Sequence, residues 1–494
     1  MNDLVLISTD DHICEPPTVF DHAPVKYRDR LPKVRTDANG IDAWEFNGRR
    51  MPNLGLNAVV GRRPEEYGVE PTAFKELRKG CYDVHARIAD MDVNGVLAAL
   101  NFPQFTGLAG QAFLCEDRDL TLAAIKAYND WHIDEWCGAY PGRFIPAALI
   151  PHWWLDEAVK EIRRVAAKGC HSINMLPVPN REGFPSWNSG HWDPVLAVCE
   201  ELGVVINLHI NDAVGATPSP ESPVNVFITN MPVSLFNTAS DILWSPITRK
   251  FPNLRFALSE GGAGWVGHFK ERADFTYRHH GAWTHQDFGG LLPSEVFDRH
   301  FYTCFIQDEI AVRLRDRTGI DNMTWECDYP HSDTTWPRSP ECLWPTLNIG
   351  GITDEEIDKI THLNAMRLYR FDPFVHLPRP QATVGALRAR AGHVDLSFLE
   401  VPAGIAATNE GGRVPTMGDM ARRLAEAYST KNWAGTACRR RRRRARIAIT
   451  QREDPWRRRR RKRPSCTGSC PRPRPMQSST AGSNRIGSAS SSRS

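Results

Sequence analysis

Short apolar runs alternate with stretches of helical periodicity along most of the chain. Eight runs have the length of buried strands, and polar residues, glycine or proline follow them. The predicted strands are residues 4–8, 95–100, 144–150, 172–175, 204–208, 255–258, 300–303 and 323–325. Apolar residues at helical spacing predict helices between and after them, starting near 86 and at about 119–140, 155–167, 192–202, 263–279, 307–317 and 354–369.

This alternation is typical of parallel β-α-β units. About eight units over some 370 residues fit a closed (β/α)8 TIM barrel of the α/β class better than an open sheet. Residues 17–82 and 210–250 interrupt the rhythm, and we expect both insertions to lie over the C-terminal face of the barrel. We therefore predict a barrel at 1–378, a C-terminal extension at 379–437 and a disordered Arg/Ser-rich tail at 438–494.

Composition excludes several classes of protein. Of the 494 residues 41% are hydrophobic, which is enough for a large core, yet no apolar run is long enough to span a membrane. The first residues lack the basic-then-apolar order of a signal peptide. Twelve cysteines occur without a Cys-x-x-Cys pair, which is typical of reduced thiols. We expect a cytoplasmic protein.

The net charge of +3 conceals two different parts of the chain. Residues 438–494 contain 19 Lys and Arg against 2 Asp and Glu, whereas the preceding residues contain 42 basic and 56 acidic side chains. The tail therefore carries a balance of +17 and the body −14. Such a tail has little to bury, so we expect disorder. It is either a nucleic-acid or membrane-surface arm or the product of a shifted reading frame in a GC-rich gene, and we favour the second reading.

Polar residues that follow the predicted strands are the candidates for chemistry, because those ends line the active face of a barrel. Asp10 and His12 follow the first strand and point the same way in an extended chain, whereas Asp11 points away. His209 follows the fifth strand and Asp328 the eighth. These four side chains form a candidate site for one divalent ion with an open position.

Glu260 and His331 are further candidates at the same face. Glu260 follows the sixth strand and precedes two glycines, so it either takes part in the site or caps the next helix. His331 lies three residues beyond Asp328 and is a pocket candidate. Taken alone, His209 in an apolar strand could equally be a core histidine, and Asp328 before Tyr-Pro could be part of a turn.

The sequence resembles the amidohydrolase superfamily, in the amidohydrolase-related branch that contains aminocarboxymuconate-semialdehyde decarboxylase. The resemblance covers about residues 4–375, and all its pieces occur in family order. The pieces are STDDHICEPP at 8–17, GCYDVHARIADMDVNGV at 80–96, GFPSWNSGHWDPV at 183–195, INLHIND at 206–212, FPNLRFALSEGGAGWV at 251–266, CDYPHSDTTWP at 327–337 and HLNAMRLYRF at 362–371.

The resemblance implies that Asp10 and His12 take the strand-one ligand positions, His209 the strand-five position and Asp328 the strand-eight position. The sequence departs from the superfamily in two places. Asp10 replaces the first histidine of the usual His-x-His motif, and Glu260 replaces the strand-six histidine of many members. The larger share of oxygen ligands shifts the expected metal from zinc toward manganese without excluding zinc.

Our leading hypothesis is a metal-dependent carboxy-lyase, a non-oxidative decarboxylase of a small carboxylic acid. Asp328 would move a proton at the reacting carbon, and His209 or His331 would orient it. Hydrolysis of an amide, ester or lactone is the alternative, with the same residues activating a water molecule. A third hypothesis is nucleic-acid binding through the tail, which the acidic body disfavours. We expect a homodimer and no membrane partner.

Deleting residues 438–494 should leave the melting temperature and turnover nearly unchanged, because a strongly basic segment with few apolar residues makes few core contacts. Thermal melts and activity assays of the full and shortened chains test this. A loss of several degrees would show that the tail packs on the barrel. If nucleic-acid retention disappears while metal content and turnover survive, the tail acts separately from the enzyme.

Overall fold

The computed structural model describes residues 1–38, 40–51, 54–55, 57–68, 73–210, 218–400 and 414–427. The chain divides into two compact units, Met1–Trp433 and Ala434–Ser494. The second unit, with the basic tail predicted at 438–494, lies outside the described residues. So do 211–217 of the second insertion and 401–413 of the extension. The boundaries expected at residues 378 and 437 stay predictions.

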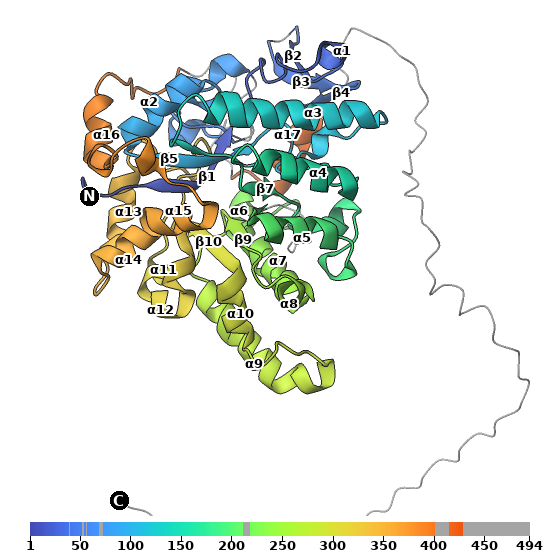
Figure 1. Cartoon of the computed structure of the whole chain (residues 1–494). Coiled ribbons are helices and arrows are strands. Elements are labelled where there is room, and N and C mark those ends of the chain that lie inside the picture. Colours follow the sequence, from blue (N-terminus) through green and yellow to red (C-terminus); the bar gives the residue numbers. More distant parts are fainter. Residues whose placement is uncertain are drawn as a thin grey trace, which may run out of the picture. The chain divides into compact units, whose positions relative to one another are not determined.

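Eight parallel strands form the central sheet of the first unit (Figure 1). They are β1 (Ile7–Ile13), β5 (Ala98–Pro103), β6 (Phe144–Ile145), β7 (Ser172–Asn174), β8 (Val205–His209), β9 (Phe256–Ser259), β10 (Phe301–Phe305) and β11 (Met323–Trp325). Their order is β6-β5-β1-β11-β10-β9-β8-β7. A parallel bridge between Ala148, just beyond β6, and Ile173 of β7 closes the sheet. The predicted TIM barrel is therefore confirmed.

The first strand differs from its prediction in an informative way. We expected it at residues 4–8, but β1 runs on to Ile13 and includes Asp10, Asp11 and His12, all of them buried. The polar residues that follow the apolar run predict that the strand ends there. The strand instead continues because its residues from Asp11 to Ile13 pair with β5, a contact that the local sequence does not reveal. A register shift against β5 falls between Ser8 and Asp11.

Helices alternate with the strands and lie around the barrel (Figure 1). The main ones are α2 (Val84–Asn94), α3 (Arg118–Asp130) with a π-helical continuation (Trp131–Cys137), α4 (Leu155–Ala166), α5 (Asp193–Leu202), α9 (Val266–Thr284), α10 (Pro293–His300), α11 (Glu309–Arg313), α12 (Arg315–Thr318), α13 (Ser339–Leu347), α14 (Asp354–Asp358), a π-turn (Lys359–Leu363) and α15 (Asn364–Tyr369). The helix predicted at 307–317 is thus two short helices, which meet at Leu314 outside the helical region of backbone angles. The helix predicted at 354–369 consists of α14, the π-turn and α15.

The two predicted insertions contain ordered structure that periodicity alone did not reveal. The first holds α1 (Val25–Arg28) and an antiparallel sheet of β2 (Lys33–Thr36), β3 (Asp42–Phe46) and β4 (Arg49–Met51). Trp44 of this sheet stacks on Phe105, in the loop after β5, with ring centroids 4.1 Å apart. The second holds α6 (Val224–Asn230), α7 (Val233–Trp244) and α8 (Ile247–Lys250).

Short 3-10 helices connect these elements, and two further helices belong to the predicted extension. The 3-10 helices are Pro64–Glu66, Phe74–Glu76, Lys79–Cys81, Gln111–Phe113, Pro179–Glu182, Trp187–Ser189, Ile320–Asn322, Pro373–Val375 and Arg379–Gln381. In the extension, α16 (Val384–Arg390) bonds to the chain before β1, where the Val384 amide donates to the Leu4 carbonyl at 2.8 Å. The segment before α17 (Met417–Ala427) pairs with the second insertion through Thr416 and Pro223.

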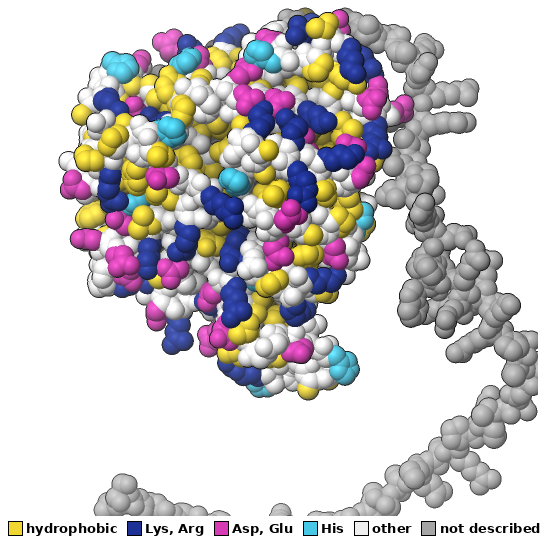
Figure 2. Space-filling model, in the orientation of Figure 1, with side chains coloured by type: hydrophobic (Ala, Val, Ile, Leu, Met, Phe, Trp, Pro, Cys, Tyr) yellow, Lys and Arg dark blue, Asp and Glu magenta, His cyan; other side chains and the backbone are white. Residues whose placement is uncertain are grey.

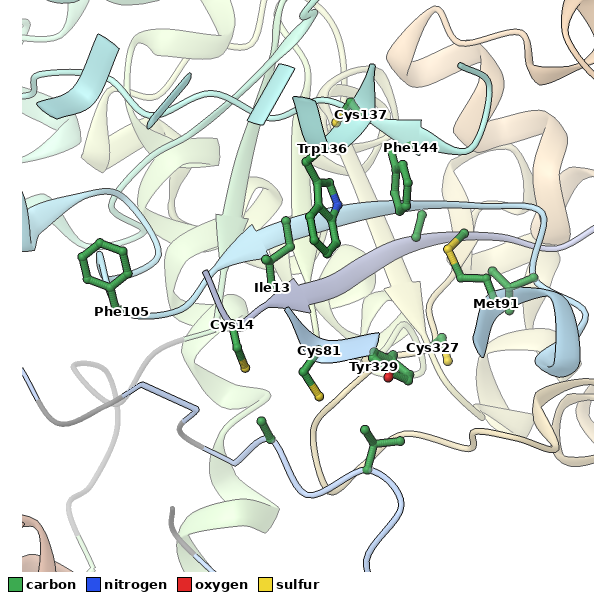
Figure 3. Packing of buried hydrophobic residues seen from close by; sticks show 14 of the residues in the cluster. Ile13, Cys14, Cys81, Met91, Phe105, Trp136, Cys137, Phe144, Cys327 and Tyr329 are labelled. Atoms are coloured by element: carbon green, nitrogen blue, oxygen red, sulfur yellow. The ribbon is translucent and has the colours of Figure 1, made fainter. Parts of the chain in front are cut away.

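The core surrounds the C-terminal half of β1. Figure 3 shows Ile13 and Cys14 there with Cys81 and Tyr329, and all four are buried. On the surface of the face in Figure 2, Lys and Arg are interspersed with Asp and Glu. No helix among the described residues is long and apolar enough to cross a membrane.

Candidate metal and catalytic site

Polar side chains converge at the C-terminal ends of β1, β8, β9 and β11. Asp10 and His12 come from β1, and His209 is the last residue of β8. The chain beyond β11 is joined to β1 by main-chain hydrogen bonds: the Asp328 amide donates to the Asp10 carbonyl at 2.8 Å, and the His12 amide to the Tyr329 carbonyl at 2.7 Å. This pairing carries Asp328 to the two β1 side chains.

Two of the converging residues adopt a backbone conformation that non-glycine residues rarely use. Glu260, directly after β9, has φ of 65°, and Asp328 has φ of 54°. Left-handed conformations cost free energy for residues with a Cβ and persist where the surroundings impose them. They turn both carboxylates toward the barrel mouth, so local strain marks the same place that the sequence singles out.

The His12 imidazole lies close to the other three side chains of the predicted ion site. The His12 Nε2 atom is 3.2 Å from the His209 Nε2 atom, 3.4 Å from Asp10 Oδ1 and 3.5 Å from Asp328 Oδ1. The His209 Nε2 atom is 3.6 Å from Asp10 Oδ2. Ligand bonds of about 2.0–2.2 Å place neighbouring ligand atoms roughly 2.8–3.6 Å apart in tetrahedral or octahedral geometry. The spacing of Asp10, His12 and His209 therefore suits a single ion, whereas Asp328 shares a second group of ligand atoms with His12, Glu260 and His331.

The charges of these side chains also fit a cation. All four carboxylate oxygens of Asp10 and Asp328 are buried without a hydrogen-bond partner of normal geometry among the described residues. Burial, together with neighbouring carboxylates such as Glu260, raises the pKa of both groups well above the usual value. Buried carboxylates that lack a counter-charge are costly, and a bound divalent ion supplies that charge.

The histidines are prepared to act as neutral ligands. The His209 Nδ1 atom lies 2.8 Å from the Ile210 carbonyl, which can only accept, so Nδ1 carries the proton and Nε2 faces the site. Burial lowers the pKa of His12 well below its usual value, with His331 and His209 adding to the effect. Neutral imidazole is the form that binds a metal.

Glu260 and His331 line the more exposed side of the cluster. Their side chains are 14% and 10% exposed, whereas those of Asp10 and Asp328 are fully buried. Glu260 Oε2 lies 2.8 Å from His209 Nε2, and His331 Nδ1 lies 2.9 Å from Asp328 Oδ1. Glu260, His331, His12 and Asp328 also offer ligand atoms within 4.8 Å of one another.

The His209 contact decides the charge of Glu260. Burial alone would raise the pKa of Glu260, but the charge and hydrogen bond of His209 outweigh it and lower the pKa. Burial would in turn lower the pKa of His209, and Glu260 reverses this and raises it. The contact therefore favours the charged form of each group. No hydrogen bond from the Glu260 side chain caps α9, which favours a role in the site over the capping alternative.

Sequence reasoning missed Glu326 and Cys304, which form a second layer behind Asp10. Asp10, Cys304 and Glu326 place ligand-type atoms within 4.8 Å of one another. Burial raises the pKa of Glu326 to about 8. Its Oε2 atom accepts the Cys304 thiol and, at 3.1 Å, the Glu260 amide, so it holds the strained Glu260 backbone in place. The signal in the sequence is spacing: Glu326 is two residues before Asp328.

Two other carboxylates, those of Asp308 and Glu15, hold loops around the site in position. The sequence by itself predicts no role for either. Asp308 accepts the Ala263 and Gly264 amides at 2.9 and 2.6 Å, which anchors the loop beyond Glu260. Glu15 accepts the Gln104 and Phe105 amides at 2.9 and 3.0 Å. The Gln104 side chain in turn contacts His331 Nε2 at 3.4 Å. Burial raises the pKa of Glu15 to about 7.

Comparison with known proteins identifies the family. Residues 71–371 match the Amidohydro_2 model, whose description is amidohydrolase. The chain belongs to the amidohydrolase family. It is an enzyme of that superfamily, and the resemblance read from the sequence motifs is confirmed.

Three similar proteins are informative. The 2-amino-3-carboxymuconate-6-semialdehyde decarboxylase of Dictyostelium discoideum is 22% identical over 272 residues, which cover 52% of this chain and 69% of that protein. An amidohydrolase from Mycobacterium avium subsp. paratuberculosis has a TM-score of 0.57 at 20% identity, covering 74% of this chain and 99% of its own. A 5-carboxyvanillate decarboxylase from Novosphingobium aromaticivorans, crystallised with manganese and 4-hydroxy-3-methoxy-5-nitrobenzoic acid, has a TM-score of 0.50 at 16% identity over 74% of this chain and 96% of its own.

Adding Mn²⁺ or Zn²⁺ to metal-depleted enzyme should raise the melting temperature, because a ligand that binds only the folded state stabilises it. The variants Asp10→Asn and Asp328→Asn should lose this gain and the bound metal, measured by thermal melts and elemental analysis. Asp333→Asn, an exposed carboxylate in the same loop as Asp328, is the matched control and should keep both. A full metal response in Asp10→Asn and Asp328→Asn would contradict the site.

The metal-free proteins give a second readout. A carboxyl whose folded-state pKa is raised destabilises the fold once pH passes its unfolded pKa, and the penalty grows until pH reaches the folded pKa. Metal-free wild type should therefore lose stability as pH rises from the usual Asp pKa upward, and Asp10→Asn should lose less.

Proposed function

We propose that this enzyme is a metal-dependent carboxy-lyase that releases CO₂ from a small organic carboxylic acid. The observation that carries the proposal is the meeting of Asp10, His12, His209 and Asp328 at the mouth of the barrel, where both carboxylates are buried. The activities in the names of the Dictyostelium and Novosphingobium proteins support decarboxylation over hydrolysis.

One divalent ion, manganese or zinc, fits these residues. Asp10, His12, His209 and Asp328 would hold it, and when bound it neutralises the substrate carboxylate and a neighbouring oxygen as charge develops. Two carboxylates among four ligands favour manganese, which the Novosphingobium enzyme contains, while the two imidazoles also suit zinc.

The side chains of the site supply the proton that the reaction needs. When the bond to CO₂ breaks, its electron pair stays on the substrate carbon, which must then take up a proton. Asp328 and His331 form the contact that can hold and deliver this proton, with His331 Nδ1 2.9 Å from Asp328 Oδ1. Between the two histidines considered for orienting Asp328, this distance favours His331, because His209 Nε2 contacts Glu260 instead.

The substrate side of the site is the side of Glu260 and His331, the two partly exposed members of the cluster. We infer that Glu260 keeps His209 in place and supplies a charge beside the reacting carbon. Glu15 and Gln104 position His331 from the opposite side, through the loop after β5. A carboxylate-bearing aromatic or unsaturated acid, the class named for the relatives, is the substrate class we propose.

A paired assay separates decarboxylation from hydrolysis. The metal-loaded enzyme should release CO₂ from members of a panel of aromatic and unsaturated carboxylic acids that includes 5-carboxyvanillate, followed by carboxyl-labelled substrate and product mass. Amide, ester and lactone substrates run in parallel should not turn over. Hydrolysis without CO₂ release from any acid would replace the lyase with the hydrolase alternative, and Asp328→Asn should abolish either activity.

Glu260→Gln should keep the fold and most of the metal but lower turnover by about a hundredfold, the low end of the effect of a group that assists proton transfer, because it removes the charge beside the reacting carbon. The substitution preserves volume and hydrogen-bonding reach while removing the charge that contacts His209. The measurements are turnover, metal content and a thermal melt. Wild-type turnover would show that Asp328 and His331 transfer the proton without help from Glu260, and loss of the metal would make Glu260 a ligand.

A further inference from the structure

A cavity lies at the opposite end of the barrel from the metal and catalytic site. It has a volume of about 370 Å³ and lies where α5 ends, where β8 and β10 begin and where α15 ends. Val205, the first residue of β8, lines it, whereas His209 is the last residue of the same strand. At about 3.3 Å per residue the two sites are separated by roughly 13 Å along β8. Nothing in the proposed reaction uses this end of the barrel.

Three arginines line this cavity, and no aspartate or glutamate does. Arg255 precedes β9, Arg367 lies on α15 and Arg370 directly follows it. Within the described parts of the chain none of the three forms an ion pair with a carboxylate. Arg163, by contrast, pairs with Glu201 at 2.6 Å. Three guanidinium groups around one cavity therefore leave an excess of positive charge there.

The guanidinium groups have donors to spare. Each carries five N–H donors. Arg255 donates to the Leu254 carbonyl at 3.0 Å, Arg370 to the Leu202 carbonyl at 3.1 Å, and Arg367 to the Asp321 carbonyl. These main-chain contacts fix each side chain and leave further donors on the same planar groups. Guanidinium groups match the oxygens of carboxylates and phosphates by paired hydrogen bonds.

The backbone around the cavity is shaped to admit these side chains. Gly203 ends α5 with φ of 63°, and a Cβ atom there would stand 2.1 Å from Arg370 Nη2. Arg370 itself has φ of 52°. The Arg367 guanidinium lies over the ring of Tyr302, 5.9 Å from its centroid, and Tyr302 also lines the cavity. The arrangement thus combines fixed cations, a flat aromatic ring and a size typical of a small-molecule site.

We propose that this cavity binds a small anion that carries two or more charged oxygens, of the phosphate or dicarboxylate type. The anion sits among Arg255, Arg367 and Arg370, where it supplies the negative charge that the lining lacks. The site is separate from the metal and catalytic site and does not depend on the proposed function.

Calorimetric titration of the full metal-loaded chain tests the proposal, with inorganic phosphate and succinate as probes at fixed ionic strength. We expect saturable binding of at least one probe with one site per chain. The double variant Arg255→Gln/Arg367→Gln should weaken that binding at least tenfold. Phosphate and succinate distinguish a phosphoryl ligand from a carboxylate ligand.

Matched controls remove the other sources of anion binding. The basic tail and the metal site are present in both proteins, so only the difference between them reports on the cavity. Arg181→Gln removes an exposed arginine on the 3-10 helix Pro179–Glu182, outside the cavity, and should bind as wild type does. If the double variant fails to fold, Arg367→Gln alone provides the test, since Arg367 is exposed. Equal binding by variant and wild type, or no saturable binding to either, overturns the proposal.

Discussion

Two carboxylates, those of Asp10 and Asp328, are buried together at the mouth of the barrel, and the rest of the site depends on how they are held there. Burial and mutual repulsion both oppose their ionisation. The main-chain bond between the Asp328 amide and the Asp10 carbonyl keeps them close despite this cost. A cation turns the same arrangement from a destabilising one into a binding site, because its charge favours the ionised form of both groups.

The surrounding residues fix the positions of these groups and keep other charges away. Arg87 is fully buried beside β1 and lies 3.6 Å from Asp11, so its charge stabilises the carboxylate that points out of the site. It also donates to the His12 carbonyl at 2.5 Å and lies over the ring of Tyr329. Glu326 and Asp308 hold the chain on either side of Glu260 through its own amide and those of Ala263 and Gly264. The strained backbone at Glu260 and Asp328 is therefore enforced by ordinary hydrogen bonds.

The barrel separates two electrostatic environments along the same strands. Carboxylates and imidazoles gather where the strands end, and arginines gather where β8 and β10 begin. Roughly one strand length of buried side chains, such as those of Asn207 and Ala257, lies between them. The opposite charges at the two ends stay apart because the packed interior of the barrel separates them.

The sequence by itself determined the barrel and the residues that gather at its mouth. It also placed seven of the eight strands, with most of their boundaries correct to within a few residues. Period-2 and period-3.6 patterns are local, and the C-terminal ends of parallel strands always meet at one face. Only the tertiary structure decided that β1 continues through Asp10 to His12 and that β2 to β4 form a separate sheet. It also decided the positions of Glu326, Cys304, Asp308 and the arginines of the cavity. Those features depend on contacts between residues far apart in the chain, such as the Glu260 amide with the Glu326 carboxylate, for which no local pattern of hydrophobic and polar residues carries a signal.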